Sequence, residues 1–215
     1  MSVVVLVPVL SRPRNVSPLV ESFRKSGTVG RLLFIANESD WDELAAIERA
    51  KSDLLVVPDA LSTWPQKINE GYRCSSEPWM LLGADDIRFR PGWFEATSKL
   101  REHGFGVIGT NDLGNPAVLR GEHSTHPLID RDYADEMGTI DGPGEIVHCG
   151  YRHWCCDNEI VETAKARKAW AFCSSAVVEH CHPYWGKAEM DDTYRLGEAH
   201  RHEDILLWNE RRLRL

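Results

Sequence analysis

The sequence predicts an α/β protein with a mixed, mostly parallel sheet that is flanked by helices and followed by a C-terminal helical tail. First, short β-branched runs alternate with helical patterns through the first half of the chain, which is typical of βα units. Second, the chain has 215 residues, 42% of them hydrophobic and 27% charged, so it is large enough to bury a core. Third, residues 190–215 carry apolar side chains at helical spacing and end in arginines, which suits a helix C-terminus.

The first half of the chain is expected to form four strands joined by helices. Each strand is indicated by an apolar, β-branched run, and each helix by apolar residues on one face. The second helix should begin at Ser39 or Asp40, with Glu43 placed for a capping box. In chain order we expect a strand at 3–9, a helix within 11–27, a strand at 31–36, a helix at 39–51, a strand at 53–58, a helix at 63–75 and a strand at 79–84.

The second half is less periodic. A helix opened by Pro91 and closed by Gly104 should precede a strand at 105–110. Residues 111–144 are rich in Gly, Pro, Asp and His, which indicates a long functional loop region with room for a short hairpin at most. After it we expect a strand or turn at 145–150, a helix at 157–170, a strand at 171–180 and a helical tail at 190–215.

Charge and cysteine content narrow the class of protein. Lys and Arg number 25 against 33 Asp and Glu, a net charge of −8, which argues against a broad, charge-driven grip on nucleic acid or anionic lipid. The apolar N-terminus lacks a basic n-region and a cleavage site and is too short to span a bilayer, and we expect no transmembrane segment. Six cysteines without a secretory signal indicate free thiols and a cytoplasmic location.

Two adjacent carboxylates, Asp85 and Asp86, follow directly on an apolar strand in "WMLLGADDIRFRPGW". Like charges at a half-solvated strand end are costly unless a cation or hydrogen-bond donors compensate them. The pair therefore suggests a site for a divalent metal. The alternative is a solvated turn in which Arg88 or Arg90 provides the ion partner.

Other polar residues follow the ends of neighbouring strands. Because ligands of open α/β sheets bind at the carboxyl ends of strands, these residues should share one rim with the carboxylate pair. A hard cation held there by one or two carboxylates, water and phosphate oxygens would neutralise the rim and hold a nucleotide diphosphate. The rim residues are Ser11 and Arg12, then Asn37, Glu38 and Asp40, then Pro58 and Asp59.

The order of motifs around the pair resembles the nucleotide-sugar-binding half of glycosyltransferases with a GT-A fold, especially those of family 2. In that family a strand ending in proline leads to an arginine-containing turn, and an acidic loop follows the second strand. A helix with Lys or Arg and "N.G" then precedes an apolar strand that ends in the DxD motif and "PGW". The matching segments cover residues 1–110 and are "VVVLVPVLSRPRNVSPLVESFRKSG", "FIANESD" and "KINEGYRCSSEPWMLLGADDIRFRPGWFE".

The family pattern continues in "HWCCDNEIVETAKARKAWAFCSSAVVEHCHP". Family members carry an acidic "ED" motif at the start of a helix, and a histidine after a further strand. Asp157 stands at the aspartate position of that motif and would be the general base, with Glu159 as the alternative. The sequence departs from the pattern at Cys156, where a glutamate is expected, and at Gly83-Ala84, where many members have more aspartate.

The resemblance implies a metal-dependent, inverting glycosyltransferase of the hexosyltransferase type that uses a nucleoside diphosphate sugar, which we expect to be a UDP-sugar. The cofactor would be Mn²⁺ or Mg²⁺, coordinated by Asp86 and by His182 or His180. One GT-A-like domain would comprise a donor half (1–110), an acceptor half (111–185) and a lid with the C-terminal helix (186–215). Contacts to the nucleotide-sugar would come from Pro8, Arg12, Asn37, Glu38, Asp40, Lys67 and Asp85, and Lys187 would reach the phosphates from a mobile loop at 183–195.

Several alternatives stay open. A nucleotidyltransferase shares the sheet and the metal but usually has a glycine-rich loop after the first strand, which "VLSRPRNVSP" lacks. A second alternative is a non-catalytic nucleotide-binding protein on the same scaffold.

The cysteines and histidines of residues 148–182 contain enough donors for zinc but no CxxC spacing. Trp64, Trp154 and Trp185 flank the expected site and could stack on a sugar, whereas the acceptor (glycan, protein, lipid or modified base) and the oligomeric state stay undefined.

Overall fold

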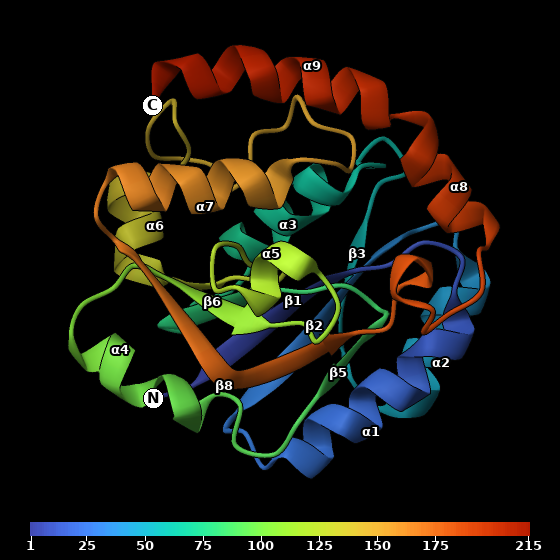
Figure 1. Ribbon diagram of the computed structural model, residues 1–215. Coiled ribbons are helices and arrows are strands. Elements are labelled where there is room, and N and C mark those ends of the chain that lie inside the picture. The colour runs from blue at the N-terminus through green and yellow to red at the C-terminus, as the bar shows by residue number, and fades with distance from the viewer.

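Eight strands form one sheet at the centre of the computed structural model, which describes residues 1–215 (Figure 1). The strands are β1 (Val3–Pro8), β2 (Gly30–Asn37), β3 (Asp53–Val57), β4 (Trp79–Leu82), β5 (Ile87–Phe89), β6 (Val107–Asn111), β7 (Leu128–Asp130) and β8 (Trp170–His180). They lie in the order β3-β2-β1-β4-β7-β6-β8-β5. All the pairs among β1 to β4 are parallel, as is β6 with β8, whereas β7 and β5 run antiparallel to their neighbours. The predicted mixed, mostly parallel sheet is confirmed.

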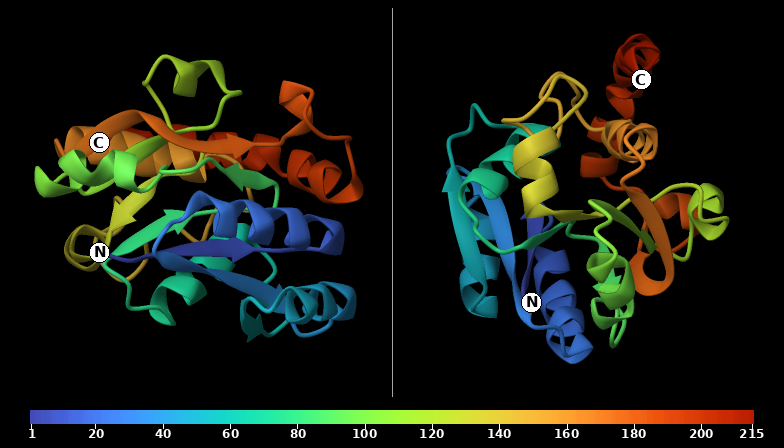
Figure 2. Two further views of the ribbon diagram at one scale, coloured as in Figure 1. Left: turned by 90° about the horizontal axis from the view of Figure 1, so that it is seen from below. Right: turned by 90° about the vertical axis from the view of Figure 1, so that its left-hand side faces the viewer.

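Helices cover both faces of this sheet. They are α1 (Val16–Ser26), α2 (Trp41–Ala50), α3 (Trp64–Arg73), α4 (Ser98–Glu102), α5 (Pro116–Leu119), α6 (Arg131–Met137), α7 (Cys156–Ala166), α8 (Asp192–Ala199) and α9 (Arg201–Arg211). Successive residues of β1 point to opposite faces, so Val5 packs in one core with Leu19 of α1 and Ile47 of α2, while Leu6 packs in a second core with Ala164 of α7. Figures 1 and 2 show α7 and α9 side by side on the face of this second core.

The elements expected in the first half are all present within a few residues of their predicted bounds. α1 ends at Ser26, and the next residue, Gly27, caps it with a left-handed φ of 72°. The capping box predicted for α2 is wrong, because Asp40 makes no capping hydrogen bond and Glu43 instead accepts the backbone N–H of Arg12 at 2.8 Å. A capping box does exist on α3, where the side chain of Thr63 and its partner three residues later satisfy each other's backbone N–H groups.

The second half departs further from prediction. Residues 111–144, expected as loop, contain α5, α6 and the short strand β7, which lies between β4 and β6 in the middle of the sheet. The strand β5 was not predicted, and the helix expected at 91–104 is reduced to a 3₁₀ turn at Glu95–Thr97 followed by α4. Residues 145–150, expected as a strand or turn, form bends and a turn. α7 ends at Ala166 because Lys168 turns the chain into β8 with a φ of 58°. A strand of three residues is too short to show an alternating apolar pattern. Whether it forms therefore depends on the neighbouring strands with which it pairs.

The helical tail is confirmed but is divided into two helices at His200. α9 is fastened to α7 by a buried ion pair, in which Arg211 donates from Nε to Glu159 at 2.6 Å and from Nη2 at 2.7 Å. No helix in residues 1–215 is both long and apolar enough to cross a membrane.

Candidate active site

The carboxylates of Asp85 and Asp86 lie at the carboxyl end of β4, against the end of β1. Gly83 allows this contact, because its N–H donates to the carbonyl of Leu6 at 2.8 Å and a Cβ in its place would lie 3.0 Å from that oxygen. Aspartate at this position would therefore clash with β1. Asp85 and Asp86 are only 1% and 4% exposed, so their charges need partners inside the protein.

Arg12 provides the main counter-charge. Its Nη2 lies 3.0 Å from Oδ1 of Asp85, and its Nη1 lies 3.8 Å from Oδ2 of Asp86. The guanidinium also stacks on Tyr194, 4.3 Å from the ring centre. Burial disfavours the charged guanidinium, but the two carboxylates outweigh that effect and raise the pKa of Arg12. Arg12 was predicted in this site, and the structure brings it to the carboxylate pair.

Asp85 and Asp86 have different surroundings. Asp86 accepts a hydrogen bond from the Tyr194 hydroxyl at 2.7 Å, and Nε2 of His180 lies 3.3 Å from the same oxygen. Burial opposes ionisation of Asp86, but the charges of His180 and Arg12 prevail and keep its pKa low. Burial raises the pKa of Asp85, since its ion pair with Arg12 and a hydrogen bond from Asn15 only partly offset it. The second oxygen of Asp86, Oδ1, is buried without any partner.

The two histidines named as metal ligands lie beside Asp86 in different protonation states. Burial works against charge on His180, but Asp86 outweighs it and raises the pKa of His180, which favours the cation. Burial and the positive charge of His180 lower the pKa of His182 to about 4, so this imidazole is neutral at physiological pH. Nδ1 of His182 accepts the backbone N–H of Tyr184 at 3.2 Å. With Nδ1 occupied by this N–H, the proton of the neutral imidazole is on Nε2, and a metal would have to displace it. The choice between His182 and His180 as the metal ligand stays a prediction.

Most of the other predicted rim residues support the loops rather than face a ligand. Asn37 donates from Nδ2 to the carbonyls of Pro58 and Leu61, and Asp40 accepts the backbone N–H of Ser11 at 2.7 Å. The buried Lys67 donates to the carbonyl of Val9 at 2.6 Å. Pro8 is buried as the last residue of β1, and Glu38 is exposed in the loop after β2. These residues shape the rim, and their predicted contact with a nucleotide stays a prediction.

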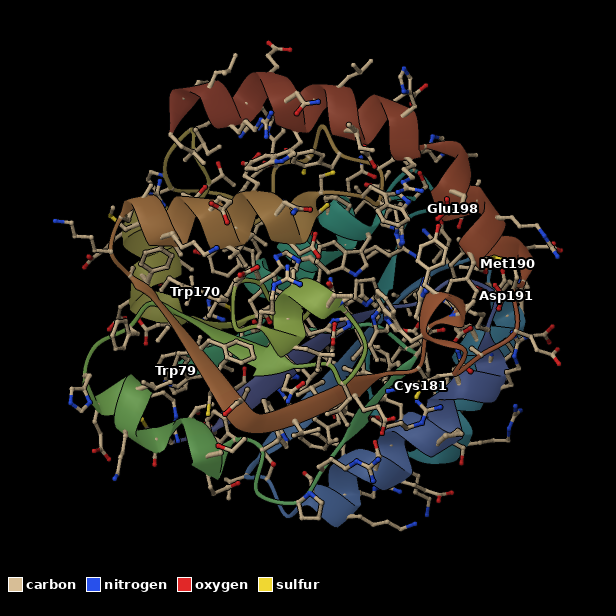
Figure 3. The ribbon with its side chains drawn as sticks, in the orientation of Figure 1. Trp79, Trp170, Cys181, Met190, Asp191 and Glu198 are labelled. Atoms are coloured by element: carbon tan, nitrogen blue, oxygen red, sulfur yellow. The ribbon has the colours of Figure 1, made fainter.

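A cavity of about 570 Å³ opens next to Asp86. Lys187 lies in its wall, where its Nζ bonds the carbonyl of Leu113 at 3.2 Å and Glu179 at 2.9 Å. Figure 3 shows the labelled side chains of Cys181, Met190 and Asp191 at this same edge of the molecule. The wall is formed by Arg14, Asn15, Asp86, Arg88, Cys181, Lys187, Ala188, Glu189, Met190, Asp191 and Tyr194. The wall has three basic side chains, which suit a ligand that carries phosphate groups, and three acidic ones.

Asp157 lies in the first turn of α7, as expected. Its Oδ1 accepts the backbone N–H of Asn158 at 2.9 Å, and its Oδ2 lies 2.9 Å from Nε2 of His123. Burial opposes ionisation, but the charge and hydrogen bond of His123 outweigh it and lower the pKa of Asp157. The side chain is 26% exposed, so the ionised carboxylate can meet a ligand.

Glu159, the alternative base, is placed differently. It is 3% exposed, held by the two hydrogen bonds from Arg211, and accepts a third from the hydroxyl of Tyr151 at 2.8 Å. A carboxylate with these partners joins α7 to α9 and has no free path to an acceptor. Cys156, at the departure from the family motif, is a buried thiol whose pKa burial raises well above its usual range.

The protonation of His153 is influenced by both carboxylate centres. Burial lowers the pKa of His153, while Asp86 and Asp157 both act in the opposite direction. Both carboxylates therefore lie within electrostatic reach of this one buried imidazole. All six cysteines are free, and no three His, Cys, Asp or Glu side chains converge closely enough to hold a metal by themselves.

Solved structures identify the architecture. The chain superposes on glucosyl-3-phosphoglycerate synthase from Mycobacterium tuberculosis, in the complex with Mn²⁺, UDP-glucose and phosphoglyceric acid, with a TM-score of 0.68 at 12% identity over 98% of this chain and 79% of that chain. The UDP complex of the same enzyme gives a TM-score of 0.67 with the same identity and coverage. The chain has a GT-A fold. No family model matches the sequence, and neither does any curated protein.

The GT-A fold brings in residues that the sequence did not single out. Tyr194 reaches Asp86 from α8, and His123 reaches Asp157 from the loop after α5. Neither is marked by a local motif. The only signal is that both lie within segments expected to carry function, His123 in the 111–144 loop region and Tyr194 in the 183–195 segment predicted as a lid. Of the three tryptophans expected to flank the site, Trp64 donates to the carbonyl of Gly83 at 3.2 Å and lies beside the carboxylate pair.

Proposed function

We propose that this protein is a metal-dependent, inverting glycosyltransferase that moves a sugar from a nucleoside diphosphate sugar to an acceptor hydroxyl. The observation that carries the proposal is the presence of two carboxylate centres with different surroundings, one after β4 and one in the first turn of α7. Asp86 has a buried oxygen without a partner beside a cavity whose wall includes three basic side chains, and Asp157 is ionised and partly exposed. These different surroundings suit Asp86 for the nucleotide-sugar donor and Asp157 for the acceptor.

The residues around Asp86 fit a divalent metal. Its free Oδ1 is a hard oxygen ligand, and His182 lies nearby, with its ring centre 4.7 Å from that of Tyr194, so that its Nε2 could become the second ligand on loss of its proton. Two protein ligands are enough for Mg²⁺ or Mn²⁺ when diphosphate and water fill the remaining positions. When bound, the metal would neutralise charge that develops on the leaving diphosphate. His180 and Arg12 would hold the other carboxylate oxygens in place.

The cavity beside Asp86 suits the diphosphate. Arg14, Arg88 and Lys187 bring three cationic side chains to its wall, and guanidinium groups match phosphate oxygens well. Mn²⁺ and UDP-glucose are bound together in the structurally similar mycobacterial synthase, which supports a UDP-sugar as the donor here. The acceptor is not defined by these residues.

Asp157 is the residue we assign as general base. The acceptor hydroxyl would give its proton to the Asp157 carboxylate as its oxygen forms a bond to the anomeric carbon. The bond between that carbon and the phosphate oxygen breaks, and UDP leaves with the electron pair. Attack from the side opposite the leaving group inverts the configuration of the sugar.

Calorimetry with nucleoside diphosphates tests the donor site. We expect UDP to bind in the presence of Mn²⁺ and to bind much more weakly with EDTA, whereas ADP and GDP should bind less well. Release of UDP from UDP-glucose, with water as acceptor, should then report cleavage without knowledge of the natural acceptor. Failure of every nucleoside diphosphate to bind, with and without Mn²⁺, contradicts the proposal. Binding of UDP without any cleavage of the panel of UDP-sugars would favour the non-catalytic alternative.

A further inference from the structure

We infer that His123 is a positioning residue for Asp157, which it holds in the orientation needed to accept the proton of the acceptor hydroxyl. The inference rests on the proposed function, because it assigns a task within that reaction. It starts from a contact between two segments that lie 34 residues apart in the chain, the loop after α5 and the start of α7.

In the contact between His123 and Asp157, the histidine is nearly buried and the aspartate is partly exposed. Nε2 of His123 lies 2.9 Å from Oδ2 of Asp157, and the side chains are 10% and 26% exposed. Oδ1 of Asp157 is held by the N–H of Asn158. Each carboxylate oxygen therefore has one donor, which fixes the plane of the group while a lone pair on each oxygen remains for a ligand.

The loop that carries His123 is itself held firmly. Oδ1 of Asp112 accepts the backbone N–H of Gly114 and of Asn115, both at 2.9 Å, and its Oδ2 accepts the hydroxyl of Thr125 at 2.8 Å. The hydroxyl of Ser124, the residue next to His123, accepts the N–H of Thr110 at 3.0 Å. His123 is thus presented to α7 by a segment that is bonded to the end of β6, not by a free loop.

The neighbouring residue is fastened to the same helix as Asp157. Lys165 of α7 donates from Nζ to the carbonyl of Glu122 at 2.5 Å. Asp157 is not the N-cap of α7, a position taken by Cys155, so its contact with His123 is not part of a capping arrangement. His123 provides a second hydrogen bond to the Asp157 carboxylate. This bond fixes the direction of the carboxylate lone pairs, which matters if one of them accepts a proton.

Charge adds to orientation. Burial alone would lower the pKa of His123, and Lys165 also lowers it, but the Asp157 carboxylate outweighs both and raises it, with a smaller contribution from Asp112. In return, His123 and more weakly His126 lower the pKa of Asp157. The carboxylate then stays ionised to lower pH than it would without the imidazole, which extends the pH range in which it can act as a base.

Two substitutions separate the hydrogen bond from the charge. His123→Leu removes both, and His123→Gln keeps an N–H donor at the distance of Nε2 without the positive charge. With UDP-glucose, Mn²⁺ and water as acceptor, we expect His123→Leu to lower kcat for UDP release about tenfold or more while KM changes less than about twofold. His123→Gln should recover much of kcat at alkaline pH. In both variants the acidic limb of the pH profile should move to higher pH. His202→Ala, an exposed histidine of α9, is the matched control.

NMR titration of the imidazoles provides a readout that needs no activity. The pKa of His123 should fall toward its usual range in Asp157→Asn, with the melting temperature near that of the wild type. An unchanged His123 titration, or a His123→Leu protein with wild-type kcat and pH profile, would overturn the inference. If the wild type binds no UDP and releases none from UDP-glucose, the proposed function fails instead, and the positioning role falls with it even where the titration shows the pair.

Discussion

The two carboxylate centres of the site are built in opposite ways. Asp86 is buried and accepts from Tyr194 and His180 on one oxygen, whereas Asp157 is partly exposed and has a single donor on each oxygen. The donors around Asp86 come from three distant segments, those around Asp157 from its own helix and one loop. A carboxylate that must hold a fixed cation gains from surrounding donors, while one that must take up a proton needs an open side.

The comparison also explains why Arg12 and His180 lie where they do. Without a bound metal or nucleotide, Arg12 and His180 neutralise Asp85 and Asp86, as a cation would. A metal and a diphosphate would add charges of both signs, so the site can gain a ligand without leaving a buried charge unpaired. Nothing similar surrounds Asp157, where His123 is the one cationic partner in contact.

The largest effect should come from removing the metal-binding carboxylate. Asp86→Ala should weaken Mn²⁺-dependent UDP binding about 100-fold or more, because the ligand with the free oxygen is lost. Asp85→Ala should weaken it less, since that side chain mainly pairs with Arg12. Calorimetry with UDP and Mn²⁺ measures both, and Glu136→Ala, an exposed carboxylate of α6, serves as control. Equal, metal-independent affinity in all four proteins would break the comparison.

The second test separates the two carboxylates of α7. Asp157→Asn should lower sugar transfer about 100-fold, because the amide oxygen can still accept the N–H of Asn158 but the side chain cannot take the proton. UDP binding and the melting temperature should stay near those of the wild type. Glu159→Gln should do the reverse, destabilising the protein by about 1–3 kcal/mol through its buried pair with Arg211. Full activity in Asp157→Asn would return this residue to a structural role.

A smaller effect should follow from the hydroxyl of Tyr194 in α8. Tyr194→Phe keeps the ring that stacks on Arg12 but removes the hydroxyl that donates to Asp86. We expect UDP affinity in the presence of Mn²⁺ to fall about fivefold, because one donor that orients the metal ligand is lost. Tyr184→Phe removes the hydroxyl that bonds Glu198 at the surface and should leave the affinity unchanged. If the two variants behave alike, Tyr194 does not orient Asp86.

The smallest effect concerns Glu43 of α2, which accepts the backbone N–H of Arg12. Burial raises the pKa of Glu43 to about 7, with Asp40 adding to the shift and the Arg12 N–H, Arg12 charge and Lys67 opposing it. A carboxyl whose pKa is raised on folding stabilises the fold below its unfolded value and loses that contribution as pH rises through about 7. Glu43→Gln keeps an acceptor for the Arg12 N–H without the charge. Its unfolding free energy should exceed that of the wild type by about 1 kcal/mol at pH 8 and match it near pH 5. Parallel pH–stability curves of the two proteins would contradict this account.

Local pattern was sufficient for much of the fold. The strands that became β1 to β4 and the helices between them are each marked by a run or a periodicity of their own, and these predictions held. The carboxylate pair after β4 and Asp157 at the start of α7 could be located for the same reason, since their places depend only on where an element ends. Parallel strands then bring their carboxyl ends to one edge, whatever the loops contain.

Tertiary structure decided what those residues contact. β7 has three residues and no pattern of its own, yet it completes the middle of the sheet because β4 and β6 offer it hydrogen bonds on both sides. Tyr194 and Asp86 are 108 residues apart, and His123 and Asp157 are 34 apart, so no local signal pairs them. Glu159, two residues from Asp157, is a structural ion because the C-terminal helix brings Arg211 to it. Periodicity is a property of neighbouring residues, whereas the partner of a buried charge is set by packing between segments that the sequence places far apart.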